Sequence, residues 1–225
     1  MMRKSFKRFV SFFLIPATRW YLRKDRRYTY KGVAITVFHG VFHPGLFYST
    51  KFLLDFLLDQ PLKDRKLLEL GGGSGLISIH CAKQGATVTV TDLSQKALSN
   101  IEFNGKQNQV SFDLVYSDMF NALPSQRFDW IVINPPYYAG EPKNEADLAW
   151  YCGKDFDYFR KLFSGLAHYR HAETRVIMVL TLGCDLEKIF SVARLHGFEF
   201  KLIKEQDVLF DGKDFLFEIR PKTAG

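Results

Sequence analysis

The feature that most constrains the fold of this chain is a regular alternation of strand-like and helix-like segments from residue 66 onward. Short runs rich in Val, Ile and Leu alternate with longer runs whose apolar residues repeat every three or four positions. Such alternation predicts a parallel sheet with helices on both faces, because two parallel strands need a long crossover connection. We therefore expect an α/β fold with a doubly wound, mainly parallel sheet of seven strands.

Turn and cap residues set the expected boundaries of these elements. Ser49 or Thr50 is expected to cap the first helix, and Gly105 is expected to end a later one. The last two strands, joined by an Asp-Gly turn, are expected to form an antiparallel hairpin, and residues 28–41 another. The expected strands are 66–70, 87–92, 110–118, 128–134, 175–182, 198–206 and 215–220, and the expected helices are 49–60, 76–84, 94–104, 156–168 and 186–196.

Charge divides the chain into a basic front and a nearly neutral remainder. Residues 1–31 contain ten Lys or Arg and one Asp, a net charge of +9, while the rest carries 21 basic and 23 acidic residues, a net charge of −2. We therefore divide the chain into a basic amphipathic N-terminal arm at 1–27, a cap or lid segment of hairpin and helix at 28–65, and a main domain at 66–225. The uncharged run at 9–18 is too short for a membrane span of about 20 residues.

Cysteine and histidine usage indicates the compartment and the absence of a metal centre. The three cysteines, Cys81, Cys152 and Cys184, are odd in number and far apart, and the six histidines show no metal-ligand spacing. We expect no metal, and a reducing, cytoplasmic environment. The arm leaves open a peripheral attachment to a membrane or ribosome through residues 1–27.

A glycine-rich turn follows the first strand of the main domain, in the run LLELGGGSGLISI. Glu69, Gly71, Gly73 and Gly75 stand at alternate positions between the strand and its helix, where glycines let a backbone approach a ligand closely. No Lys-Ser or Lys-Thr pair follows, and Leu76 stands where the dinucleotide pattern has its third glycine. The turn predicts a nucleotide-type site, but not a phosphate loop.

Two acidic residues end the next two expected strands. Asp92, followed by Leu93, is placed to accept hydrogen bonds from ribose hydroxyls. Asp118 is placed to accept a bond from an adenine amine, with Met119 and Phe120 beside it to sandwich the ring. At successive strand ends beside the glycine turn, these acids predict a site for a nucleoside without a pyrophosphate.

A stiff arch ends the fourth strand of the main domain. Asn134, Pro135, Pro136 and Tyr137 follow the apolar run IVI. Proline has no amide hydrogen and fixes φ, so the chain cannot continue as a helix or a central strand. The carbonyl groups of the arch are therefore available to another partner.

These motifs resemble those of class I S-adenosylmethionine (SAM)-dependent methyltransferases, whose first motif is E/D-x-G-x-G-x-G. The resemblance covers roughly residue 66 to the C-terminus. It implies that Glu69 faces the methionine end of SAM, that the glycines cradle it, and that Asp92 and Asp118 hold its ribose and adenine. The implied product is S-adenosylhomocysteine, and no catalytic metal is needed.

Within that class, Asn-Pro-Pro-Tyr is similar to the motif of N-methyltransferases that act on planar nitrogen. The Asn134 side-chain oxygen and the Pro135 carbonyl would accept both protons of an NH₂ group, and Tyr137 would stack on its plane. This positioning would aim the nitrogen at the sulfonium methyl and favour the transition state.

The chain also resembles the HemK family of protein glutamine methyltransferases and the methyltransferase small domain proteins. VFHPGLFYST is similar to the segment that closes over the methyl donor, which makes Phe47, Tyr48 and Thr50 candidate pocket residues. AWYCGKDFDYFRKL is similar to the family's G-x-D-G-x-x-x-Y/F helix start. The resemblance implies a glutamine amide of a protein, such as a release factor or ribosomal protein, as the substrate. In place of the helical recognition domain of bacterial release-factor enzymes, we expect only the basic aromatic arm within roughly the first 45 residues of this sequence.

Two other functions remain open at this point. The first is an RNA base N-methyltransferase acting on adenine N6 or guanine N2 of rRNA or tRNA, with the arm contacting phosphates. The second is a non-catalytic SAM-binding protein tethered to a membrane or ribosome by the arm. The sequence predicts neither an oligomeric state nor a role for His43, which the HPG turn could bring near the pocket.

Overall fold

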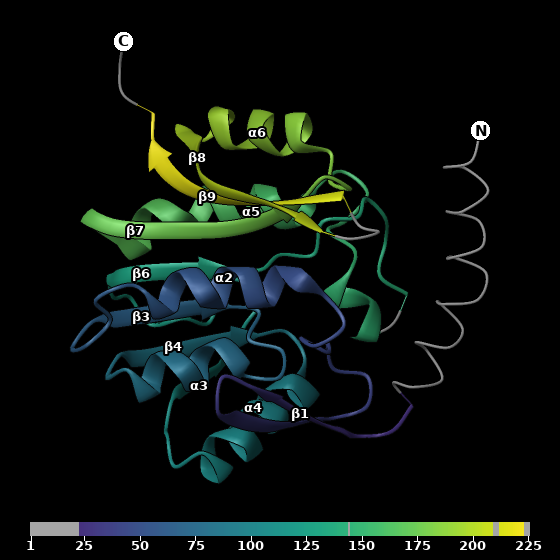
Figure 1. Ribbon diagram of the computed structural model, residues 1–225. Coiled ribbons are helices and arrows are strands. Elements are labelled where there is room, and N and C mark those ends of the chain that lie inside the picture. The colour runs from purple at the N-terminus through teal and green to yellow at the C-terminus, as the bar shows by residue number, and fades with distance from the viewer. Residues whose placement is uncertain (1–22, 144, 209–211, 223–225) are drawn as a thin grey trace.

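The computed structural model of this chain contains a seven-stranded sheet, as the alternation predicts. The structure describes residues 23–143, 145–208 and 212–222, so most of the N-terminal arm lies outside the described residues, as does the Asp211 turn. The strand order is β5-β4-β3-β6-β7-β9-β8, and β9 alone runs in the direction opposite to the other strands (Figure 1). The strands are β3 Lys66–Leu70, β4 Thr87–Asp92, β5 Asp113–Tyr116, β6 Phe128–Ile133, β7 Arg170–Thr181, β8 Phe198–Val208 and β9 Gly212–Pro221.

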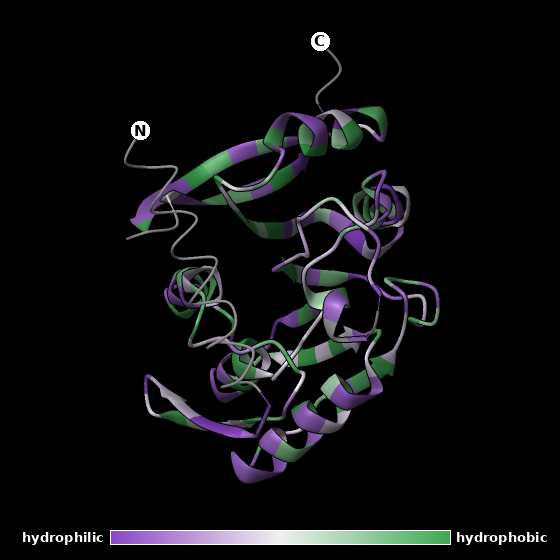
Figure 2. Cartoon of the chain, turned by 90° about the vertical axis from the view of Figure 1, so that its right-hand side faces the viewer, coloured by the Kyte–Doolittle hydropathy of each residue, from purple (hydrophilic) through white to green (hydrophobic). Residues whose placement is uncertain are grey.

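Helices cover both faces of this sheet. Buried residues of α2, α3 and α4 form one hydrophobic cluster with the first face, and those of α5 and α6 form a second cluster with the opposite face. Figure 2 looks along the strands, with α2 and α3 on one side of the sheet and α5 on the other. The helices are α2 Tyr48–Leu58, α3 Leu76–Lys83, α4 Gln95–Gln107, α5 Asp157–Gly165 and α6 Leu186–Leu195, with 3-10 turns at η1 Glu145–Ala149 and η2 Leu166–Tyr169.

The two clusters explain why the central strands carry apolar residues on both faces. In β3, Leu67 belongs to one cluster and Leu68 to the other, and both side chains are fully buried. Successive side chains of a strand point to opposite faces, so a strand covered on both sides is apolar at most positions rather than at alternate ones.

A separate two-stranded hairpin precedes the sheet. It consists of β1 Arg26–Tyr30 and β2 Val33–Val37, which pair antiparallel. Buried residues of β2 and α2 share one hydrophobic cluster with β3 and β4. The division of the chain at residue 65 into a lid and a main domain stays a prediction.

Asparagines of α4 hold the outer edge of β2. Asn100 Oδ1 accepts from the Phe38 amide at 2.9 Å, and its Nδ2 donates to the Thr36 carbonyl at 2.7 Å. Asn104 Oδ1 accepts from the Thr36 amide at 2.8 Å, and its Nδ2 donates to the Thr36 carbonyl at 2.9 Å. Residues four apart lie on one face of a helix, so the two side chains satisfy consecutive backbone groups of the strand edge.

Asn104 also links the hairpin to the glycine turn. Its Nδ2 donates to the Ser74 carbonyl at 2.9 Å, and both Asn100 and Asn104 are fully buried. One side chain therefore bonds both to β2 and to the turn that follows β3.

Two predicted helix boundaries are wrong. Gly105 does not end α4, which continues to Gln107; a Cβ atom on Gly105 would lie 2.7 Å from the Phe112 ring, so this glycine is required by close packing. Neither Ser49 nor Thr50 caps α2, whose N-cap is Phe47 without a side-chain cap bond. The expected strand 110–118 is shorter, and the expected helix 156–168 is divided between α5 and η2.

The structure also bears on membrane, disulfide and metal chemistry. In residues 23–143, 145–208 and 212–222, no helix is long and apolar enough to cross a bilayer. The same ranges contain no group of three or more potential metal ligands. Cys81, Cys152 and Cys184 are all free thiols.

Replacing Asn104 with alanine should destabilise the protein by about 3 kcal/mol, because the Thr36 amide and the buried Ser74 carbonyl lose the partner that Asn104 supplies, while the Thr36 carbonyl keeps only Asn100. Urea denaturation measures this difference in the free energy of unfolding. Gln107→Ala, on an exposed position of the same helix, is the control and should change stability by less than about 0.5 kcal/mol. Equal stabilities of the two variants would contradict the role assigned to Asn104.

Candidate functional site

A cavity of about 430 Å³ lies at the carboxyl ends of the parallel strands, where ligands bind in open α/β sheets. The ends of β3, β4 and β6 all contribute, because parallel strands finish at the same edge. The cavity brings together most of the residues expected from the sequence: Thr50, Glu69, Gly71, Gly73, Asp92, Leu93, Asp118, Met119, Asn134, Pro135, Pro136 and Tyr137.

Three expected site residues do not line this cavity. A Cβ atom on Gly75 would lie 3.2 Å from the side chain of Ile101, so this glycine contacts α4 rather than the cavity. Tyr48 is half exposed, with the Lys51 ammonium 4.1 Å from the centre of its ring. Phe47 lies behind the lining residues and packs on them.

The glycine turn after β3 is held against β4. The amides of Gly71 and Gly72 donate to the Thr91 carbonyl at 2.8 and 3.2 Å. A Cβ atom on Gly72 would lie 2.3 Å from Cγ1 of Val90, so only glycine fits this approach. Gly71 and Gly73 have φ of 76° and 56°, a left-handed backbone that favours glycine.

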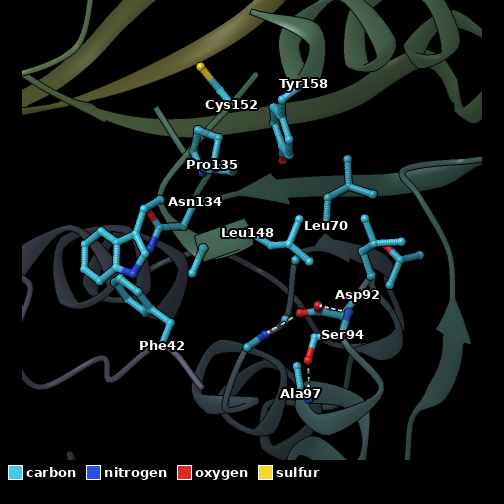
Figure 3. Close-up of a pocket in the computed structure, with 18 of the residues that line it drawn as sticks. Phe42, Leu70, Asp92, Ser94, Ala97, Asn134, Pro135, Leu148, Cys152 and Tyr158 are labelled. Atoms are coloured by element: carbon cyan, nitrogen blue, oxygen red, sulfur yellow. Dashed lines mark hydrogen bonds between the residues drawn. The ribbon is translucent and has the colours of Figure 1, made fainter. Parts of the chain in front are cut away.

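The Asp92 carboxylate is fixed by two backbone amides. Its Oδ2 accepts from the Gly73 amide at 3.0 Å and its Oδ1 from the Ser94 amide at 2.9 Å (Figure 3). Ser94 in turn caps α4 by accepting from the Ala97 amide at 3.0 Å. Burial raises the pKa of Asp92, and the backbone hydrogen bonds oppose that rise. The carboxylate therefore joins the glycine turn to α4.

Glu69 is a buried carboxyl group at the end of β3. Its side chain is 4% exposed and accepts a short hydrogen bond from the Ser78 hydroxyl of α3. Burial raises the pKa of Glu69 to about 8, while the bond from Ser78 lowers it. This group can therefore carry a proton in the free protein near neutral pH.

At the end of β5, Asp118 Oδ2 accepts a hydrogen bond from Lys161 of α5 at 2.5 Å. Met119 is buried and lines the cavity beside it. The expectation that Phe120 also flanks the ligand is wrong, because its ring stacks on Tyr169 at 4.6 Å and belongs to the hydrophobic core.

The arch after β6 brings an amide group to the cavity. Asn134 Nδ2 donates to Thr50 Oγ1 of α2 at 3.0 Å, which leaves Oδ1 as an acceptor. Pro135 is buried, and Tyr137 lines the cavity. Figure 3 shows Asn134 and Pro135 at one end of the drawn cluster and Asp92 at the other, with Leu148 between them in this view.

Sequence reasoning missed an aromatic wall made of Phe42 and Trp150. Both residues line the cavity, with ring centroids 5.5 Å apart. Phe47 packs behind them, 5.0 Å from Phe42 and 4.8 Å from Trp150. The wall joins two segments that are remote in sequence, and in a chain with 22 phenylalanines no local pattern distinguishes these rings from core rings.

Backbone bonds hold the loop that carries Trp150. The Tyr138 amide donates to the Trp150 carbonyl at 3.0 Å, and the Cys152 amide to the Tyr138 carbonyl at 2.9 Å. The Gly140 amide donates to the Gly153 carbonyl at 3.2 Å. These bonds hold residues 138–140, which follow the arch, beside residues 150–153.

His43 lies near the site but does not line the cavity. It is buried, it accepts at Nδ1 from the Gly45 amide at 3.1 Å, and burial lowers its pKa. Its neighbour Pro44 is the lining residue of the HPG turn.

Comparison with known proteins identifies the family of the chain. A family model described as the methyltransferase small domain matches residues 32–151, from the hairpin to Tyr151 beside the arch. The chain belongs to the methyltransferase small domain family.

Relatives of this methyltransferase small domain protein include glutamine methyltransferases. The chain is 34% identical over 118 residues to a Methanocaldococcus jannaschii protein named as a protein N5-glutamine methyltransferase, covering 52% of this chain and 57% of the relative. It is 35% identical over 103 residues to the release factor glutamine methyltransferase of Streptococcus pneumoniae, covering 44% of this chain and 37% of the relative. The chain thus spans little more than half of these relatives at most.

Solved structures share the fold. The T. thermophilus 16S rRNA N2 methyltransferase, solved with AdoMet and guanosine, matches with a TM-score of 0.64 at 20% identity, over 88% of this chain and 50% of that chain. The E. cuniculi Mtq2 complex, described as responsible for methylation of the eRF1 termination factor, matches with a TM-score of 0.61 at 18% identity, over 82% and 99%. At these identities the likeness is one of fold.

The Glu69 carboxyl should make the stability of this methyltransferase small domain protein pH-dependent. In the folded state it keeps its proton up to about pH 8, whereas the unfolded chain loses it near the ordinary value of 4.5. The folded state binds more protons between these values, so this group makes stability fall as pH rises from about 4.5 to about 8.

Urea denaturation at a series of pH values tests this dependence. Glu69→Gln should flatten the fall in the free energy of unfolding, whereas Glu102→Gln, on an exposed position of α4, should keep it. A Glu69→Gln profile parallel to that of the unaltered protein would contradict the raised pKa.

Proposed function

We propose that this protein is a SAM-dependent N-methyltransferase whose acceptor is the side-chain amide of a protein glutamine. The observation that carries the proposal is the amide group of Asn134, which is held by Thr50 at the same cavity as the glycine turn and Asp92. An acceptor for NH₂ protons and a nucleoside-type site are thus parts of one cavity.

The donor set of the cavity fits SAM. Its volume of about 430 Å³ lies within the range of small-molecule sites. A Cβ atom on Gly71 would meet no atom within 4 Å, so the turn faces open space that a ligand can occupy. The lining lysine, Lys161, is paired with Asp118, and no cation follows the glycines, which favours a nucleoside without phosphates.

Each lining group has a role in this proposal. Asp92 would accept hydrogen bonds from the ribose hydroxyls, and Leu93 would pack beside them. Asp118 would accept from the adenine amine while Met119 packs against the ring. Glu69 would face the amino acid end, where a positive ammonium would favour its ionised form.

The arch would position the acceptor nitrogen. Asn134 Oδ1 and the Pro135 carbonyl would accept its two protons, and Tyr137 would stack on the amide plane. SAM would supply the methyl group: the nitrogen lone pair would form the N–C bond, the C–S bond would break with its electron pair left on sulfur to give S-adenosylhomocysteine, and one amide proton would leave to solvent. The two oxygens stabilise the positive charge that develops on nitrogen.

Charge near the cavity favours a protein over RNA as the acceptor. The loop at 141–157 carries five acidic side chains against Lys143 and Lys154, and three of the acids line the cavity. Phosphate groups would be repelled there, whereas a polypeptide needs no positive surface. The names of the glutamine methyltransferase relatives point the same way.

The basic arm at residues 1–27 is proposed to contact a partner of its own. Its excess of positive charge, most of it outside the described residues, would contact an acidic partner such as ribosomal RNA or an anionic membrane surface. The proposed location of the protein is the cytoplasm, because a release factor or ribosomal protein substrate is made there.

Incubation with methyl-labelled SAM and a Gly-Gly-Gln peptide tests the proposal. The label should enter the glutamine amide, and Asn134→Ala should lower the rate by about 100-fold or more, because an acceptor for the transition-state charge is lost. Asn121→Ala, on an exposed turn, is the matched control and should keep full activity. Full activity of Asn134→Ala, or transfer to RNA but not protein in a fractionated lysate, would refute the proposal.

Asp92→Asn should weaken SAM binding by roughly tenfold or more, because a charge-assisted acceptor contributes about 1.5–3 kcal/mol. Isothermal titration calorimetry with SAM measures the dissociation constant. Asp113→Asn, on the exposed opposite end of β5, should bind as the unaltered protein does, and Asn134→Ala should remain within about threefold. Unchanged binding by Asp92→Asn would exclude the assigned ribose contact.

A further inference from the structure

We propose that Thr50 is a positioning residue that turns the side-chain oxygen of Asn134 toward the acceptor, rather than a wall of the substrate pocket. The inference rests on the proposed function, since it concerns how the acceptor nitrogen is held. Its central observation is the hydrogen bond from Asn134 Nδ2 to Thr50 Oγ1 at 3.0 Å, between residues 84 positions apart.

The hydroxyl of Thr50 is committed to the site rather than to its own helix. Thr50 is the third residue of α2, and the N-cap is Phe47, which has no side-chain cap bond, so the Thr50 hydroxyl does not cap the helix. The residue is only 6% exposed and lines the cavity. A buried hydroxyl needs a hydrogen-bonding partner, and here the partner is Asn134.

Both ends of this contact are anchored. Leu53, Leu54 and Leu57 of α2 are fully buried in the cluster that includes β7 and β9, so the helix is fixed on the sheet. Asn134 follows β6 directly and precedes two prolines that fix the backbone. The 3.0 Å hydrogen bond thus joins side chains from two rigid elements, so the direction of the Asn134 amide is fixed.

The orientation of the amide decides what the acceptor meets. The two ends of an asparagine amide are nearly identical in shape but opposite in hydrogen bonding. When Nδ2 faces Thr50, Oδ1 is left to accept a proton from an incoming NH₂ group. In the reversed orientation two NH₂ groups would face each other, and the nitrogen would lose one of the two acceptors that aim it.

Thr50→Val tests this role, because valine keeps the branched shape and removes the hydroxyl. With the glutamine peptide as the probe, kcat should fall about tenfold, while the dissociation constant for SAM should stay within about twofold. Thr50→Ser keeps the hydroxyl and should recover most of the lost rate. Thr89→Val, the same change at a buried threonine of β4 outside the cavity lining, is the control and should match the unaltered protein.

A second readout needs no turnover. In ¹⁵N-labelled protein the Asn134 side-chain NH₂ signal, assigned by its loss in Asn134→Ala, should exchange with solvent slowly, and Thr50→Val but not Thr50→Ser should speed that exchange. Unchanged exchange and rate in Thr50→Val, while Asn134→Ala is inactive, would overturn the inference and leave the proposed function standing. If the unaltered protein methylates no glutamine, the proposed function is wrong. The exchange measurement still tests the inference in that case, because unchanged exchange in Thr50→Val would show that Thr50 does not hold the Asn134 amide.

Discussion

The parallel pairing of β3, β4, β5 and β6 is the constraint on which the rest of this structure depends. Strands that run in one direction finish at one edge, so the groups at residues 69, 92, 118 and 134 meet there although they are distant in sequence. Helices cover both faces of the sheet, and the cavity lies at this edge. Strands paired in this way are covered on both faces, and their runs of apolar residues are the pattern from which the sequence predicts the fold.

The polar groups at this edge are costly to bury, and each is held by a partner from another segment. Asp92 is bound by backbone amides of the glycine turn and the start of α4, and Glu69 by Ser78 of α3. Asn134 is bound by α2 through Thr50. Such partners fix the direction of each group before any ligand arrives, which lowers the cost of binding and of positioning. The polar groups of the site are therefore preorganised for a ligand.

The sequence predicts those parts of the site that depend on local chemistry. The sequence predicts the positions of Asp92, which ends a strand, and of Asn134, which directly follows one, and it predicts the turn because glycine favours its left-handed backbone. The sequence could not predict Thr50 as a partner of Asn134, since the contact spans 84 residues and depends on how α2 packs. The prediction that Gly105 ends α4 is wrong for a related reason. A glycine is required there because the Phe112 ring packs closely against it.

The most direct test of the central claim is a crystal structure of the protein with S-adenosylhomocysteine. The account predicts the ribose hydroxyls on the Asp92 carboxylate, the adenine between Asp118 and Met119, and the sulfur directed toward Asn134 with the side-chain oxygen facing the remaining space of the cavity. A ligand whose sulfur points away from Asn134, or a nucleoside bound anywhere other than this edge of the sheet, would contradict it.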